Sequence, residues 1–157
     1  MSSLPQDWAE TSLGELEDRH WLFFKNGFSS GDHKLDGDGI PHMRPFNISS
    51  DGRITFGQIK RIPASNRARA TDARLLPGDI LFNNTNSEEL VAKCALWAAS
   101  DGLFTLSNHM TILRVAENQS LSSGFLSYYL FWHWLTGLRS EERRVGKECR
   151  SRWSPYH

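Results

Sequence analysis

The sequence predicts an α+β fold, a mixed and strand-rich domain followed by the start of a long helix. Short apolar or β-branched runs at 80–82, 91–99 and 110–115 are bounded by Gly, Pro and Asp turns, as strands are. Residues 124–138 are apolar nearly all round and have the length of a helix. With 39% hydrophobic and 23% charged residues, the 157-residue chain has the composition of a globular protein.

The first half of the chain is expected to alternate between loops and extended segments. Residues 8–16 form a short extended or helical segment anchored by Leu13 and Leu16, and the Gly/Asp-rich stretch 27–39 must be a loop. Residues 40–48 have extended character, because each proline disfavours a helical conformation in the residue before it. A turn at 49–52 is expected to join them to 53–56 in a hairpin.

In the second half, the turn 75–79 leads into the strand 80–82, and 91–99 and 110–115 supply further core strands. The helix over 124–138 must be buried, either in its own domain or against another helix, because apolar side chains surround it.

Residues 139–157 show neither a helical nor a strand period. They closely resemble the in-frame translation of a common short-read sequencing adapter, so we expect this tail to be non-native and the preceding chain to be a gene fragment; a native basic tail is the alternative. Without the six basic and three acidic residues of the tail, the remaining chain has 12 basic and 15 acidic residues. Cys149 belongs to the tail, so the remaining chain has a single cysteine, Cys94, which we expect to be a buried thiol.

No apolar run approaches the ~20 residues that a membrane span needs. The N-terminal segment lacks the basic end and apolar stretch of a signal peptide, so the sequence predicts a cytoplasmic protein without membrane contact.

Charge is uneven along the chain. Residues 53–74 contain six basic side chains against the single carboxylate of Asp72, although the whole chain has a formal net charge of zero. Such a local basic patch can meet phosphate even on an acidic domain, and a solvated loop is the equally simple alternative.

Catalytic, metal and cofactor sites are not predicted. The acidic loop at 32–38 fits no calcium-loop register, the histidines lack metal-ligand spacing, and neither a Gly-x-Ser-x-Gly elbow nor a phosphate-cradling glycine loop is present. A small hydrolase using His109 or His42 with a nearby Asp is a weaker alternative.

Several motifs occur in a fixed order along the chain: Leu4-Pro-x-x-Trp8, Leu13-Gly-Glu15, the segment 39–48 with Asp51-Gly52, the segments 77–87 and 89–93, Ser107-Asn-His109 with the strand end 113–115, and Tyr128-Tyr-Leu130. Taken together, they resemble the target-recognition domain of a type I restriction-modification specificity (S) subunit. One departure is Ala92, where the family usually has Gly before the Lys.

The resemblance implies a non-catalytic subunit that recognises double-stranded DNA and directs methylation and cleavage by methyltransferase (M) and restriction/translocase (R) subunits. It divides the chain into a recognition domain at 1–121, the start of a coiled-coil spacer helix at 122–138 and the tail at 139–157. Met1 close to the first motif favours the first of two such domains. A recognition domain within a single-chain restriction-methylation enzyme is the alternative that the downstream sequence would decide.

DNA contacts are expected from cations and amides, for phosphate, and from exposed polar side chains, for base edges. The resemblance implies that the sequence between the motifs varies with the DNA target, so the segment 53–74 is the better candidate for specificity, whereas the loop 83–87 is expected to be scaffold. The predicted DNA-binding residues are Arg44, Asn47, Arg53, Lys60, Arg61, Ser65, Asn66, Arg67 and Arg69.

Overall fold

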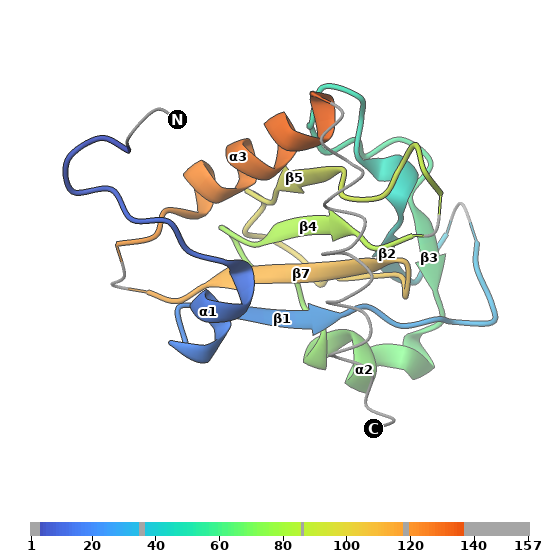
Figure 1. The fold of residues 1–157 in the computed structure, drawn as a ribbon. Helices are drawn as coiled ribbons and strands as arrows, with labels where there is room; N and C mark the ends of the chain where they lie inside the picture. The colour runs from blue at the N-terminus through green and yellow to red at the C-terminus, as the bar shows by residue number, and fades with distance from the viewer. Residues whose placement is uncertain (1–3, 35–36, 86, 118–119, 137–157) are drawn as a thin grey trace.

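A computed structural model describes residues 4–34, 37–85, 87–117 and 120–136 (Figure 1). A four-stranded antiparallel sheet has the order β1-β7-β4-β5, and a three-stranded sheet has the order β3-β2-β6. Together with the helices, these sheets confirm the predicted α+β class. The strands are β1 Leu22–Asn26, β2 Ile40–Met43, β3 Lys60–Ile62, β4 Ile80–Asn83, β5 Cys94–Leu96, β6 Thr105–Leu106 and β7 Met110–Val115.

Three α-helices, α1 Leu13–Asp18, α2 Arg67–Asp72 and α3 Ser123–Leu135, and two 3-10 turns, Pro45–Asn47 and Ala64–Asn66, complete the described structure. Helix α1 begins with a capping box, in which the Ser12 hydroxyl accepts from the Glu15 amide and the Glu15 carboxylate accepts from the Ser12 amide at 2.7 Å. In Figure 1, α3 runs along the β5 edge of the four-stranded sheet and α1 lies beside β1. Among the described residues, no helix combines the length and apolarity needed to cross a membrane.

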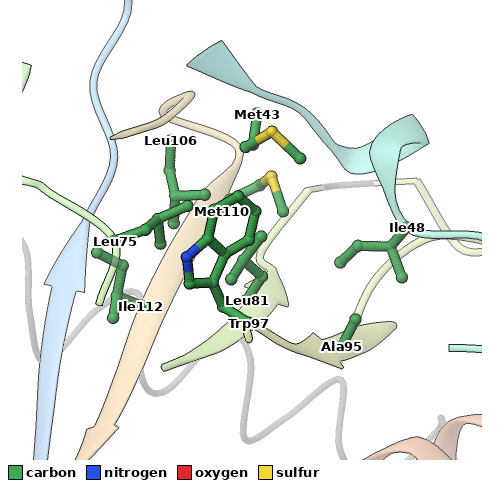
Figure 2. Packing of buried hydrophobic residues seen from close by; sticks show 9 residues of the cluster. All are labelled: Met43, Ile48, Leu75, Leu81, Ala95, Trp97, Leu106, Met110 and Ile112. Carbon is green, nitrogen blue, oxygen red and sulfur yellow. The ribbon is translucent and has the colours of Figure 1, made fainter. Parts of the chain in front are cut away.

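The four-stranded sheet is buried on both faces. Leu81, Ala95 and Ile112 point into a core centred on Trp97, which Figure 2 shows surrounded by Met43, Leu106 and Met110. The alternate residues along the same strands point to the opposite face and pack under α1 and α3. This second core contains Leu16, Leu22, Ile80, Cys94, Leu113, Leu126 and Leu130. Burial on both faces explains why the central strands β4 and β7 are mostly apolar in sequence, whereas the edge strand β1 is partly exposed and mixes polar with apolar residues.

The first half of the chain departs from the predicted hairpin. Residues 53–56 contribute only an isolated bridge between Ile48 and Ile54, and β2 pairs instead with β3 and β6. The extended segment stops at Met43, because Pro45–Asn47 forms a 3-10 turn. The sequence also missed β1, β3 and α2, which are short and mix polar with apolar residues.

Helix α3 confirms the helix predicted at 124–138 over its described part, but its burial is one-sided. Leu126, Leu130 and Trp134 are buried against the sheet, whereas the opposite face is exposed although it too is apolar. That exposed face consists of Phe125, Tyr128, Tyr129, Trp132 and Leu135. Positions 137–138 of the predicted helix and the tail 139–157 lie outside the described residues.

Candidate nucleic-acid interface

Three chain segments run parallel at one end of the molecule and end at the same edge. Strand β2 pairs with β6 in parallel, with Met43 opposite Leu106, and Phe28 bridges Ser107 in parallel. Because the segments share one direction, the residues that follow them emerge together. These are Ser29 and Ser30 after Phe28, Arg44 after β2, and Asn108 and His109 after β6.

Gly27 allows the segment that ends at Phe28 to lie close to the backbone of Leu106 and Ser107. A Cβ atom at Gly27 would lie 2.1 Å from the carbonyl oxygen of Ser107 and 2.5 Å from that of Leu106. Both atoms belong to the backbone, so only glycine fits without displacement of the neighbouring segment. The amides of Gly27 and Phe28 also donate to the carbonyls of Met110 and Leu106 at 3.0 Å.

Strand β3 brings further basic residues to the same end. It runs antiparallel to β2, with Lys60 opposite His42 and Arg61 opposite Pro41. The backbones of Arg61 and Lys34 exchange two hydrogen bonds, of 2.7 and 2.9 Å, and the Arg61 guanidinium donates to the Gly39 carbonyl at 3.0 Å.

The loop residues 28–34 are the meeting point of the predicted DNA-binding residues. The Asn66 amide lies 3.5 Å from the Ser30 hydroxyl, and the Arg69 guanidinium stacks 4.3 Å from the centre of the Phe28 ring. The Arg44 guanidinium donates to the His33 ring. We call this surface the basic end, defined as residues 28–34 with Arg44, Lys60, Arg61, Asn66 and Arg69.

A pocket of about 250 Å³ opens beside the basic end. Its polar wall comes from the residues that follow the three parallel segments, and Pro45, Phe46 and Leu90 form its apolar wall. The polar lining residues are Ser29, Ser30, His33, His42, Arg44, Ser107, Asn108 and His109.

Two of the three histidines that line the pocket, His33 and His42, favour the neutral form. Burial lowers the pKa of His42 to about 4, and its Nε2 lies 3.0 Å from the Phe28 carbonyl, the position of an N–H donor. Burial, followed by the positive charges of Arg44 and Lys60, also lowers the pKa of His33. A neutral His33 ring is required to accept from Arg44, so geometry and electrostatics agree.

The remaining predicted residues lie in different environments. Ser65 and Arg67 are exposed beside Asn66, where a ligand at the basic end can reach them. Arg53 is exposed on the turn 49–53, next to Asp51 and apart from the basic end. The adjacent Gly52 packs against the Phe131 ring of α3.

Asn47 is fully buried, and the structure assigns it to the scaffold. Its side-chain oxygen accepts from the Arg44 amide at 3.0 Å, and its amide nitrogen donates to the Thr55 carbonyl at 3.2 Å. A side chain that is saturated by backbone groups in this way has no surface from which to read a base edge. We therefore correct its predicted role from DNA contact to support of the Arg44 backbone.

Sequence reasoning missed His33 and Lys34 of the basic end and Asn108 and His109 of the adjoining pocket. The loop 27–39 drew attention only through its acidic residues, and Ser107-Asn-His109 only as a family motif. The useful signal was Gly27 itself, since a glycine directly after a β-strand often marks a close backbone approach.

The geometry gives little support to catalysis. Within the described ranges, no three His, Cys, Asp or Glu side chains converge as metal ligands do, although three histidines line one pocket. The ring of His42 is buried, so neither its Nε2, which lies 3.0 Å from the Phe28 carbonyl, nor its Nδ1 is open to solvent as a base. His109, the other histidine of the hydrolase alternative, is exposed.

The fold is a strand-rich α+β domain, and comparison with known proteins narrows the class of protein to which it is similar. No protein-family model matches the chain. Over 133 residues it is 26% identical to a protein of Methanocaldococcus jannaschii described as the MjaX specificity subunit of a type I restriction enzyme. The alignment covers 85% of this chain but 29% of that protein, so the chain spans less than a third of its relative.

Solved structures agree on the fold. The HsdS subunit from Thermoanaerobacter tengcongensis superposes with a TM-score of 0.57 at 20% identity, covering 86% of this chain and 30% of that one. A chain from a structural analysis of assembly and conformational transition in a type I restriction-modification system gives a TM-score of 0.56, also at 20% identity, over 85% of this chain and 29% of its own. These matches confirm the resemblance to type I specificity subunits that the motifs predicted.

Proposed function

We propose that this chain is a DNA target-recognition module of a type I restriction-modification specificity subunit. It contributes sequence recognition and no catalysis of its own, and the methyltransferase and restriction subunits of the complex carry out the chemistry. The observation that carries the proposal is the basic end, where five predicted DNA-binding residues meet around one loop, 28–34.

The basic end and the exposed residues beside it have the two kinds of group that a DNA reader needs. Lys60, Arg69 and the neighbouring Arg67 provide cations for phosphate, and Asn66 and the neighbouring Ser65 provide polar side chains for base edges. The carboxylate of Asp32 lies within the basic end and that of Asp38 in the adjoining loop, and they limit, without cancelling, the positive charge. A surface of this kind binds DNA with an affinity that falls steeply as salt rises.

Resemblance along most of the chain supports the recognition role rather than the alternatives. A hydrolase would need a nucleophile in contact with an accessible base, whereas the ring of His42 is buried. A single-chain restriction-methylation enzyme would use the same recognition surface as a specificity subunit. These two possibilities therefore differ only in sequence that lies outside this chain.

The decisive experiment assembles the complete specificity subunit with its methyltransferase subunits and measures duplex binding by fluorescence anisotropy at several salt concentrations. We expect salt-dependent binding that Arg67→Gln weakens. Arg19→Gln removes an equally exposed charge beside Trp21, away from the basic end, and is the matched control. Absence of salt-dependent DNA binding by the assembled complex would refute the proposal.

A further inference from the structure

The pocket beside the basic end has the chemistry of an anion site. None of the residues that line it carries a carboxylate, and its lining supplies the Arg44 guanidinium, the hydroxyls of Ser29 and Ser30 and the Asn108 amide. An anion needs hydrogen-bond donors from several directions, and three separate chain segments supply them here. The volume, about 250 Å³, accommodates a phosphodiester group together with several waters.

Three buried polar atoms of the pocket residues have unmet hydrogen-bonding capacity. The Arg44 Nε, the Ser107 Oγ and the His42 Nδ1 lack a partner among the described residues, and Ser107 is only 3% exposed. Arg44 and Ser107 offer donors, whereas the His42 Nδ1 is an acceptor when Nε2 donates to the Phe28 carbonyl. Buried polar groups are normally paired, because a group left unpaired loses its hydration without compensation. Two unpaired donors on residues of the same pocket therefore point to a ligand there.

The charge around the pocket has the sign that an anion requires. Arg44 and Lys60 both act on His33 and disfavour its protonated form, which indicates excess positive charge at that point. Asp32 acts in the opposite direction and is the weakest of these influences. A phosphate placed beside Arg44 would be attracted by both cations.

We propose that this pocket holds a backbone phosphate of the bound DNA, with Arg44 as the principal contact and Ser29, Ser30 and Asn108 as neutral donors. The inference rests on the proposed DNA-binding function and assigns Arg44 to positioning of the duplex rather than to base reading. A phosphate contact sets the register of the protein on DNA and carries no sequence information of its own. The neighbouring residues Ser65 and Asn66 are then left to discriminate bases.

The test uses the complete subunit in its methyltransferase complex, with a target duplex and an unrelated duplex of equal length. Arg44→Gln should weaken binding to both by the same factor, about tenfold for one lost charge-assisted contact. It should also reduce the slope of log K against log salt by roughly 0.9, the value for one phosphate. Arg44→Lys keeps the charge and should retain the slope, and Arg19→Gln should change neither quantity.

Asn108→Ala is a second variant at an exposed turn, where folding is not at risk. We expect a few-fold loss on both duplexes with an unchanged slope, because the amide is neutral. Loss confined to the target duplex in the Arg44 variants would identify a base contact and overturn the proposal, as would unchanged binding in Arg44→Gln. Absence of binding by the unaltered complex would instead refute the proposed function itself.

Discussion

Arg114 on β7 donates two hydrogen bonds of 2.7 Å to the carboxylate of Asp79, whose side chain is only 1% exposed. The same guanidinium donates to the Arg74 carbonyl at 3.0 Å, and the Asp79 carboxylate also accepts from the Leu76 amide at 2.7 Å. Hydrogen bonding to Asp79 raises the pKa of Arg114. The pair therefore ties the turn before β4 to the central strand of the larger sheet.

Removing Arg114 should destabilise the protein substantially. Arg114→Ala leaves the Asp79 carboxylate buried without its cation, and we expect a loss of about 2–4 kcal/mol in the free energy of unfolding, measured by urea denaturation. Arg53→Ala breaks the exposed contact with Asp51 and should leave the urea midpoint unchanged. Equal effects of the two substitutions would contradict this interpretation.

Ala92 adopts a left-handed backbone conformation, with φ at 67°. This is the position where the family usually has Gly, and an alanine there pays about 1–2 kcal/mol in strain. Ala92→Gly relieves this strain but also removes a buried methyl group, which lowers the stability by about 0.8 kcal/mol. The net expectation is that Ala92→Gly stabilises the protein by up to about 1 kcal/mol.

The same substitution at Ala95 is the control. Ala95 is equally buried but lies in β5 with an ordinary backbone conformation, so Ala95→Gly should destabilise by about 1 kcal/mol or more. Thermal or chemical unfolding of the two variants should give opposite signs, and a destabilised Ala92→Gly would contradict the strain argument.

Gly27→Ala should damage both stability and the basic end. Its new methyl group would meet two backbone oxygens at under 3 Å, so the loop must move away from β6, at about 3 kcal/mol. Gly31→Ala is the control in the same loop, because nothing lies within 4 Å of its Cβ position. Thermal unfolding distinguishes the two variants, and a fully stable Gly27→Ala protein would show that the two segments are not held in close contact.

Stability should fall as the pH is lowered from about 6.5 to 4. His42 has a folded-state pKa of about 4, below its unfolded value, so the unfolded chain binds more protons across this range and protonation favours unfolding. The shift corresponds to about 3 kcal/mol. The contribution of His42 to the free energy of unfolding is fully present above the pKa that His42 has in the unfolded chain. It is lost as the pH falls towards the pKa of His42 in the folded protein, about 4.

Urea denaturation at several pH values tests this expectation. His42→Phe should flatten the dependence, and His109→Gln, which alters an exposed ring, should not. His33 has a lowered pKa as well and should account for a smaller remaining slope. An unchanged pH profile in His42→Phe would remove His42 as the cause.

The exposed apolar face of α3 should make residues 1–138 self-associate when taken alone. Tyr128 is 71% exposed and Trp132 46%, one turn apart, which is an unusual surface for an isolated domain. We expect the association to depend on Phe125, Tyr128 and Trp132, whereas Trp134 is buried and donates to the Glu89 carbonyl at 3.2 Å.

Sedimentation velocity tests the association. Tyr128→Glu with Trp132→Glu should shift the chain towards monomer without lowering its stability, while Phe23→Glu, at a single exposed aromatic of β1, should have less effect. A monomeric unaltered chain at all concentrations would contradict the expectation.

The amino-acid sequence alone determined the elements whose signal is local and contiguous. Strands β4 and β7 come from mostly apolar runs, because burial on both faces leaves little polar alternation along a strand. Helix α3 comes from a segment that is apolar nearly all round, although only one of its faces is buried. It also determined the resemblance, since motif order survives where overall identity does not. The basic segment 53–74 was visible from composition alone.

Only the tertiary structure decided which of those basic residues act together. Parallel pairing of β2 with β6 and the bridge from Phe28 to Ser107 join segments more than sixty residues apart, and no local pattern encodes such pairings. The same packing buried Asn47 and moved Arg53 away from the basic end, although both looked equivalent to Arg44 in sequence. Residue type sets what a side chain can bind, but burial and long-range strand pairing decide which side chains a ligand can reach together.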